Sequence, residues 1–233
     1  MAASEVGDEP LMHASDGPAW IARNRLAGAL AAAQAGAHVL VMDDGFQNPT
    51  LAKDLSILVI DAEAGLGNGR VLPAGPLRES LDAGLARADA AVILSSTKEQ
   101  RPIPHFLAAF KPPILRARLA PLAPPPPGKL IAFAGIGRPE KFFATLEEAG
   151  AELEECALFP DHHPYSQEDL DWLERLSAER GAQLITTEKD FMRLPADWRH
   201  KTEMYKVAAR FEDEAALDAL LAPILLRTNN SHG

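Results

Sequence analysis

Short runs of apolar residues, each ending at a polar residue, alternate along the chain with longer helix-like segments. In the first half, such runs are rich in Val, Ile and Leu and are typical of buried parallel strands; they cover His38–Met42, Leu55–Ile60 and Ala90–Leu94. The Ala-rich segment Arg25–Ala35, which Gly36 follows, has the composition and the end signal of a helix. This alternation predicts an α/β fold built on parallel sheets.

The alternation restarts after four consecutive prolines, Pro124 to Pro127. Such a run is excluded from a helix interior and from a central strand, so we interpret it as a connector between domains. Beyond it the pattern predicts strands over 130–134, 153–158 and 183–186, and helices over 140–149 and 167–180. Ser166 followed by Asp169 predicts a capping box at the start of the second helix.

Two segments with strand-like composition flank the second half, residues 114–119 and residues 204–210. We expect them to pair as a two-stranded hinge, after which the amphipathic tail 212–226 returns to pack on the first domain. The predicted organisation is therefore a first domain, a hinge or linker, a second and smaller α/β domain, and a return strand with a C-terminal helix. These cover residues 1–113, 114–127, 128–203 and 204–233, respectively.

The composition narrows the classes of function. The chain has 233 residues, 47% of them hydrophobic, which is enough for a substantial core. Its formal charge of −10, without any run of Lys and Arg, argues against nucleic-acid binding. A single cysteine, Cys156, indicates a reducing compartment. No apolar stretch approaches the roughly 20 residues of a membrane-spanning helix, so any membrane contact is expected to be peripheral.

The strongest candidate chemistry lies at the end of the run His38–Met42, where Asp43 and Asp44 precede a glycine. In open α/β sheets ligands bind beyond the carboxyl ends of the strands, and carboxylates there suit Mg²⁺ beside substrate phosphates. Two adjacent carboxylates also repel each other unless a cation or a proton intervenes. The alternative is a solvated turn, because Asp and Gly are common turn residues.

The segment Gly65–Glu79 is dense in glycine and proline and carries Arg70 and Arg78. Glycines let the backbone approach a ligand closely, and arginines bind phosphate oxygens through two hydrogen bonds. A long surface loop with ordinary charges is the alternative interpretation.

Three further segments carry charged or titratable side chains. His162 and His163 lie between a predicted strand and a predicted helix, where an imidazole can shuttle a proton; a zinc site and a simple turn with a helix cap are the alternatives. Lys189 follows a strand and can face an anionic ligand or begin a solvated helix. Gly7–Pro10 has the composition of a fraying terminus.

Taken together, five segments resemble tetraacyldisaccharide 4'-kinases in their order and spacing; they are Gly7–Pro10, Asp43–Gln47, Gly67–Glu79, Phe159–His162 and Thr186–Asp190. The resemblance covers essentially the whole chain. It implies an incomplete P-loop-kinase-like parallel-sheet domain joined by a hinge to a second, smaller α/β domain. The implied reaction is transfer of the γ-phosphate of ATP, with Mg²⁺, to the 4'-hydroxyl of a tetraacyldisaccharide 1-phosphate in lipid A biosynthesis.

The resemblance also implies partners and site residues. The partners are the acylated disaccharide lipid and, peripherally, the cytoplasmic face of the bacterial inner membrane, with no nucleic acid and with the chain as a monomer. Asp8 corresponds to the catalytic base, with which His162 pairs from the second domain. The implied cofactor-binding residues are Asp43, Asp44, Gln47, Arg78 and Glu79; the substrate-binding residues are Arg25, Asn68 and Arg70; the metal ligands are Asp43, Asp44 and Glu9.

The chain departs from the family pattern in one major respect. The family's phosphate loop, Gly-x-x-x-x-Gly-Lys followed by Ser or Thr, precedes the segment Gly7–Pro10, and these 233 residues contain no such sequence. The family's first strand and membrane-associated amino-terminal helix are missing as well, and Ser80 replaces a proline. We therefore expect an impaired kinase, truncated at its amino terminus or assigned a wrong start. The alternatives are a non-catalytic glycolipid-binding remnant and a metal-dependent phosphatase that uses Asp43 and Asp44.

Overall fold

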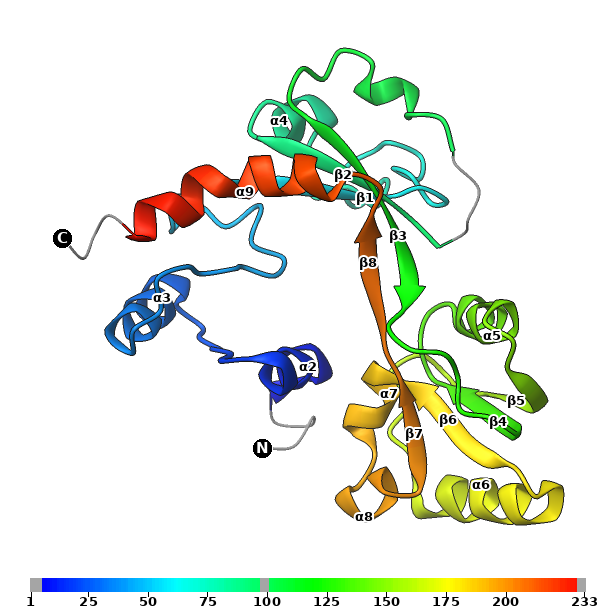
Figure 1. Ribbon diagram of the computed structural model, residues 1–233. Coiled ribbons are helices and arrows are strands. Elements are labelled where there is room, and N and C mark those ends of the chain that lie inside the picture. The colour runs from blue at the N-terminus through cyan, green and yellow to red at the C-terminus, as the bar shows by residue number, and fades with distance from the viewer. Residues whose placement is uncertain (1–5, 97–100, 230–233) are drawn as a thin grey trace. The chain divides into compact units, whose positions relative to one another are not determined.

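The computed structural model describes residues 6–96 and 101–229, and the chain divides into two compact units. Unit 1 comprises residues 1–21 and 120–208, and unit 2 comprises residues 22–119 and 209–233. Each unit is built around a four-stranded sheet with helices packed on it (Figure 1). This confirms the predicted α/β class.

The sheet of unit 1 has the strand order β5-β4-β6-β7, and its three pairings are all parallel. The strands are β4 (Lys129–Ala134), β5 (Glu152–Leu158), β6 (Gln183–Thr187) and β7 (Thr202–Tyr205). The helices that connect them are α5 (Pro139–Glu148), α6 (Gln167–Arg180), α7 (Glu188–Arg193) and α8 (Ala196–Arg199). The three strands and two helices predicted for this half are thereby confirmed to within one residue at each end.

The central strand β4 is apolar on both faces because helices cover both. Ile131 and Phe133 belong to the core cluster that includes Leu170 and Leu173 of α6. The alternate positions of β4 belong to a second cluster, which includes Leu146 of α5. Figure 1 shows α5 and α6 on opposite sides of the sheet. A strand buried on both faces reads as a continuous apolar run, which is why it was predicted from the sequence.

The predicted capping box at the start of α6 is present. Ser166 Oγ accepts a hydrogen bond of 3.2 Å from the backbone N–H of Asp169, and Asp169 Oδ2 accepts one of 2.8 Å from the N–H of Ser166. Two N–H groups without partners inside the helix are satisfied in this way. The opposite end of α6 stops at Gly181, which has the left-handed conformation (φ 60°) that favours glycine.

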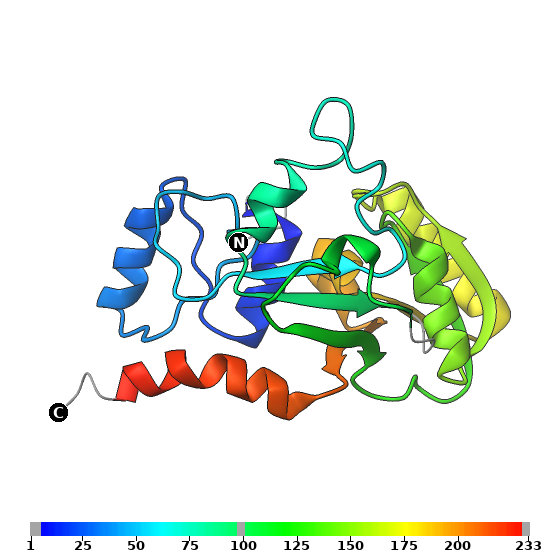
Figure 2. The same cartoon turned by 90° about the horizontal axis from the view of Figure 1, so that it is seen from above.

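The sheet of unit 2 has the strand order β1-β2-β3-β8, with β1, β2 and β3 parallel. The strands are β1 (Ile57–Asp61), β2 (Ala90–Ser95), β3 (Ile114–Pro121) and β8 (Val207–Phe211). The helices are α3 (Arg25–Gln34), α4 (Leu81–Leu85), the short 3₁₀ helix η1 (His105–Leu107) and α9 (Glu214–Asn229). Figure 2 shows the three parallel strands and α9 from above.

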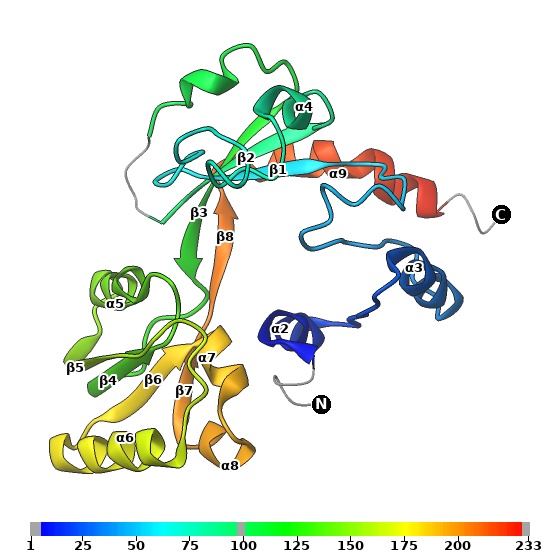
Figure 3. The same cartoon turned by 180° about the vertical axis from the view of Figure 1, so that it is seen from behind.

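Strands β3 and β8 are neighbours in the sheet and lie side by side, with arrows in opposite directions, in Figures 1 and 3. The predicted pairing of residues 114–119 with the later segment is thus confirmed for residues 207–210, whereas Met204 and Tyr205 belong to β7. Helix α9 packs through Leu217 and Leu220 on a core cluster of β2 and β3, as expected of the C-terminal tail.

The predicted buried strand His38–Met42 is wrong. The structure assigns these residues to no strand, and Val41 is 94% exposed. The apolar composition favours an extended backbone, but a strand is stable only when its N–H and C=O groups pair with a neighbouring strand. Within the described residues, the sheet of unit 2 ends at β1, and His38–Met42 is not part of that sheet.

Residues 6–21 group with unit 1, although residues 1–113 were expected to share one domain. They contain helix α2 (Asp8–Asp16), which has no buried residue and contacts α7. The domain limits at residues 113 and 128 and the hinge itself stay predictions. Among the described residues, no helix is both long enough and apolar enough to cross a bilayer.

The core of unit 1 gives a direct test of this packing. Leu146 is fully buried, whereas Leu158, on β5, is 63% exposed. Leu146→Ala is expected to lower the free energy of unfolding by about 2–5 kcal/mol, because it removes transfer energy and leaves a cavity. The matched change Leu158→Ala should stay within about 0.5 kcal/mol of the unmodified chain. Chemical denaturation measures both, and equal losses would contradict the assigned burial.

Candidate functional site

The site residues expected from the sequence divide between the two units. Asp8, Glu9 and His162 lie in unit 1, together with Lys189. The remaining ones lie in unit 2; they are Arg25, Asp43, Asp44, Gln47, Asn68, Arg70, Arg78 and Glu79.

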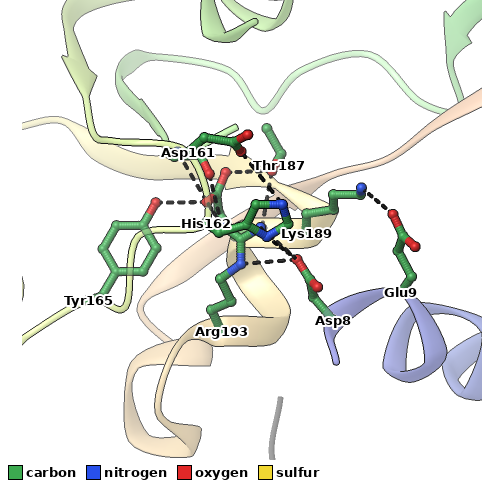
Figure 4. A network of polar contacts seen from close by, with 10 residues as sticks. Asp8, Glu9, Asp161, His162, Tyr165, Thr187, Lys189 and Arg193 are labelled. Atoms are coloured by element: carbon green, nitrogen blue, oxygen red, sulfur yellow. Dashed lines mark hydrogen bonds and ion pairs between the residues drawn. The ribbon is translucent and has the colours of Figure 1, made fainter. Parts of the chain in front are cut away.

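In unit 1, the side chains of Asp8 and His162 meet beside the arginine Arg193 (Figure 4). Asp8 Oδ2 lies 2.6 Å from Arg193 Nη2 and 3.7 Å from His162 Nδ1. Asp8 comes from the first turn of α2, His162 from the loop after β5 and Arg193 from the last turn of α7. Asp8 and His162 therefore meet inside one unit, whereas the resemblance placed His162 in a different domain from Asp8.

A fully buried carboxylate, Asp190, lies behind these three side chains. Its Oδ1 accepts hydrogen bonds from the backbone N–H of Gly135 (3.1 Å), from Tyr165 Oη (2.9 Å) and from Arg193 Nη1 (3.0 Å). Its Oδ2 accepts one of 2.6 Å from Thr187 Oγ1. A buried charge is tolerated only when it is paired and hydrogen-bonded, and Asp190 meets both conditions.

The loop after β4 must come very close to Asp190 to donate its N–H. A Cβ atom at Gly135 would lie 2.9 Å from the carbonyl oxygen of Pro160 and 3.3 Å from Asp190 Oδ1. Only glycine fits at this distance. Burial, with the neighbouring Asp190 charge, raises the pKa of Tyr165, so its hydroxyl keeps its proton and remains a donor.

Sequence reasoning missed Arg193 altogether and noted Asp190 only as part of a motif. Both carried a local signal. Thr187, Asp190 and Arg193 follow one another at intervals of three residues directly after a strand, which is the spacing of an N-cap, its partner and an i,i+3 ion pair. The contact with Asp8, which is 185 residues from Arg193, had no local signal.

The environment of Asp8 keeps its carboxyl group ionised. Burial by itself raises the pKa of Asp8, but the hydrogen bonds and the positive charge of Arg193 outweigh it, so the pKa lies below the ordinary value of 3.8. A carboxylate in this state can accept a proton or a hydrogen bond from a hydroxyl group at neutral pH.

The neighbouring acidic residue, Glu9, contacts a cationic side chain. Its Oε1 lies 2.6 Å from Lys189 Nζ, and both side chains are partly exposed. Lys189, which was expected to face an anionic ligand, thus has a carboxylate partner within the chain. A third ion pair joins Asp16, at the other end of α2, to Lys206 at 3.0 Å. Helix α2 is therefore held on unit 1 by charged contacts along its length.

In unit 2, Glu79 is the centre of a polar cluster. Its two carboxylate oxygens each lie 2.7 Å from a terminal nitrogen of Arg87, and Gln47 Nε2 donates to Oε1 at 3.1 Å. The Arg87 guanidinium also lies over the ring of Phe46, 5.1 Å from its centroid. The hydrogen bond from Arg87 lowers the pKa of Glu79. The structure thus brings together two of the expected residues, Gln47 and Glu79.

The adjacent aspartates end the segment that was expected to be a strand. Asp44 has a left-handed backbone (φ 50°), and its Oδ2 lies 3.5 Å from Arg78 Nη2 with both side chains exposed. Mg²⁺ is usually bound through one or two carboxylates plus water and substrate phosphates. Asp43 and Asp44 fit that ligand set, and the described residues contain no group of three or more His, Cys, Asp and Glu side chains that could bind a metal by themselves.

Among the three residues expected to bind substrate, Asn68 stabilises its own loop. Its Nδ2 donates to the carbonyl of Ala74 at 2.8 Å, and its Oδ1 accepts from the N–H of Arg70 at 3.1 Å. The carbonyl of Arg70 in turn accepts from the N–H of Leu77. Arg25 is the first residue of α3, whose N-cap is Asn24.

Three relatives, all named tetraacyldisaccharide 4'-kinase, are similar in sequence over nearly the whole chain. That of Hyphomonas neptunium is 54% identical over 223 residues, that of Phenylobacterium zucineum 54% over 226, and that of Rhodospirillum centenum 52% over 235. The matches cover 96%, 94% and 99% of this chain but 66%, 69% and 68% of the relatives. The chain thus spans about two thirds of the length of these proteins.

A family comparison and a solved structure agree with these relatives. The family described as tetraacyldisaccharide-1-P 4'-kinase, LpxK, matches residues 1–225. LpxK from Aquifex aeolicus, crystallised in complex with ATP, is 28% identical and superposes with a TM-score of 0.73, covering 96% of this chain and 70% of that protein.

The lowered pKa of Asp8 predicts that this residue makes the free energy of unfolding depend on pH. Asp8→Asn is expected to lower the free energy of unfolding by about 1 kcal/mol at neutral pH, because Arg193 loses a charged partner that is partly exposed. A depressed carboxyl pKa contributes stability above the unfolded value, so the difference between the two proteins should vanish as pH falls below 3.8. Denaturation measured across pH checks this. A difference that stays constant down to the most acidic buffer would contradict the assignment.

Proposed function

The chain belongs to the tetraacyldisaccharide-1-P 4'-kinase family, and from this premise we propose that it serves transfer of the γ-phosphoryl group of ATP to the 4'-hydroxyl of a tetraacyldisaccharide 1-phosphate, a lipid A precursor. The observation that carries the proposal is the ionised Asp8 carboxylate, held by Arg193 and 3.7 Å from His162. Phosphoryl transfer requires chiefly the positioning of reactants and the handling of one proton.

In the proposed reaction the hydroxyl oxygen of the sugar forms a bond to the γ-phosphorus, and the bond from that phosphorus to the bridging oxygen of ADP breaks. The hydroxyl proton passes to the pair formed by Asp8 and His162. The ionised state of Asp8 supports this role, because a base must be free of its proton at working pH. The exposed ring of His162, 65% accessible, lets the proton leave to solvent afterwards.

The residues of unit 2 are proposed to serve the nucleotide. Asp43 and Asp44 would hold Mg²⁺, which neutralises charge on the phosphate oxygens. Arg78 would exchange the exposed carboxylate of Asp44, 3.5 Å away, for a phosphate, since an exposed pair at that distance is weak. Glu79 and Gln47 form a hydrogen-bonded cluster with Arg87 and would position the loop that follows Asn68.

The place of action follows from the substrate. An acylated disaccharide is anchored in a bilayer, and ATP is present on the cytoplasmic side. We therefore propose that the chain acts at the cytoplasmic face of the inner membrane through peripheral contact. We propose separately that it acts as a monomer.

A test of the reaction uses radiolabelled ATP and the disaccharide in detergent micelles. The 233 residues contain no Gly-x-x-x-x-Gly-Lys followed by Ser or Thr. Because each lost donor to the transition state costs about 10²-fold or more, this polypeptide by itself should turn over at least about 10²-fold more slowly than the Hyphomonas relative. Equal turnover would contradict the proposed impairment. Disaccharide binding without any transfer, and without an effect of ATP on the melting temperature, would favour a glycolipid-binding protein instead.

The base is tested in an active context, by fusing the chain to the part of the Hyphomonas relative that it does not match. Asp8→Asn in this fusion should lower kcat by about 10²–10⁴-fold, the usual contribution of a general base. Asp16→Asn is the matched control, since Asp16 is also an ion-paired aspartate of α2, and it should leave kcat unchanged. Similar kcat values for both variants would exclude Asp8 as the base.

A further inference from the structure

Arg87 contacts two segments of unit 2 that lie far apart in the sequence. Its two terminal nitrogens donate to the two carboxylate oxygens of Glu79, each at 2.7 Å. Its guanidinium group also lies over the ring of Phe46, 5.1 Å from the centroid. Gln47 in turn donates to Glu79 Oε1 at 3.1 Å. One arginine therefore joins the segment that contains Phe46 and Gln47 to the segment that contains Glu79.

The backbone of Arg87 is attached to the buried part of unit 2. Arg87 follows helix α4, and its N–H donates to the carbonyl of Gly84 at 3.1 Å. The next residue, Ala88, is buried, and strand β2 begins at Ala90, which is fully buried. Phe46, by contrast, lies in no helix or strand. The side chain of Arg87 thus reaches from the edge of the core to segments that have little regular structure of their own.

The pair of Arg87 and Glu79 is of a kind that contributes to stability even at a surface. Most exposed ion pairs contribute little, but two parallel hydrogen bonds from an arginine to a carboxylate are an exception. The side chain of Glu79 is 22% exposed, whereas that of Asp44 is 78% exposed. The stacking of the guanidinium group on Phe46 adds an attraction that a lysine reproduces only in part.

The contacts of Arg87 lie next to two residues proposed to serve the nucleotide. Glu79 directly follows Arg78, and Phe46 comes two residues after Asp44. Asp44 and Arg78 are exposed and lie 3.5 Å apart, and such a pair is too weak to fix the spacing of two irregular segments. The stronger contacts of Arg87 can fix it, because they act one and two residues away.

We propose that Arg87 is a positioning residue for nucleotide binding: it holds Glu79 and Phe46 together and thereby presents the Asp44 carboxylate and the Arg78 guanidinium group at a fixed spacing. Asp44 would serve the magnesium ion, and Arg78 the phosphate oxygens. The identity of this ligand rests on the proposed kinase function. Arg87 itself acts through the other residues, because both of its terminal nitrogens are engaged by Glu79.

The first test needs no activity. Order parameters from ¹⁵N relaxation are measured for the backbone of residues 44–48 in the 233-residue chain. In Arg87→Ala they should fall from about 0.85, typical of a rigid backbone, to below about 0.6. Arg87→Lys should give intermediate values, because lysine keeps the charge but lacks the planar fork that binds both oxygens of Glu79. If Arg87→Ala does not fold, Arg87→Lys decides alone. Unchanged order parameters in a folded Arg87 variant overturn the proposal.

Arg227→Ala and Arg227→Lys are the matched controls. Arg227 is also an exposed arginine of unit 2, and it pairs with the carboxylate of Asp54 at 3.1 Å. Both changes should leave the order parameters of residues 44–48 as they are in the unmodified chain. An equal fall in the Arg227 variants would show that any exposed ion pair of unit 2 has this effect, and it would overturn the specific role of Arg87.

The second test uses the fusion described above and separates this proposal from the proposed function. Arg87→Lys should raise KM for magnesium-bound ATP about tenfold and leave KM for the disaccharide unchanged, because one charged hydrogen bond that places the nucleotide side is lost. A loss of stability alone would lower the amount of active enzyme and would leave both KM values as they were.

The outcomes of the second test are distinct. If the fusion is active and KM for magnesium-bound ATP does not change in Arg87→Lys, the positioning role fails and the kinase function stands. If the fusion phosphorylates no disaccharide while the order parameters fall, the kinase function fails and the fixation of residues 44–48 by Arg87 stands.

Discussion

The arrangement of unit 1 depends on one constraint, the burial of the Asp190 carboxylate. A charged group that is shielded from solvent must be fully hydrogen-bonded. The Asp190 carboxylate accepts hydrogen bonds from Gly135, Tyr165, Thr187 and Arg193. These partners come from the loops after β4 and β5, from the last residue of β6 and from α7. One buried charge thereby joins the carboxyl ends of three parallel strands, where α/β sheets bind their ligands.

The same constraint explains how a helix with no buried side chain is held in place. Helix α2 has no fully buried side chain, and three ion pairs join it to unit 1, those of Asp8, Glu9 and Asp16 with Arg193, Lys189 and Lys206. Exposed ion pairs contribute little, so among these three pairs the one with the buried guanidinium of Arg193 contributes most. The residue that stabilises α2 is thus also the residue proposed as the base, because the ionised carboxylate serves both purposes.

Unit 2 handles charge differently. Glu79 is neutralised by Arg87 through two hydrogen bonds, whereas Asp44 is exposed and meets Arg78 only at 3.5 Å. The pair of Glu79 and Arg87 stabilises the loop that contains Glu79, whereas Asp44 and Arg78 both stay accessible to solvent. The exposed Asp44 carboxylate suits the proposed role beside a cation that arrives with its phosphate ligands and its water.

The sequence by itself determined the strands β4, β5 and β6 and the helices α5 and α6 of unit 1, the strands β1 and β2 and the helix α3 of unit 2, and the capping box at Ser166. Periodicity, glycine ends and cap residues act within a few positions, so a local pattern was enough for these elements. It also singled out Asp8 and His162 through resemblance. Only the tertiary structure decided that His38–Met42 forms no strand, since pairing needs a neighbour. Only the tertiary structure revealed Arg193, because its contact with Asp8 joins residues 185 positions apart, and no local pattern records such a distance.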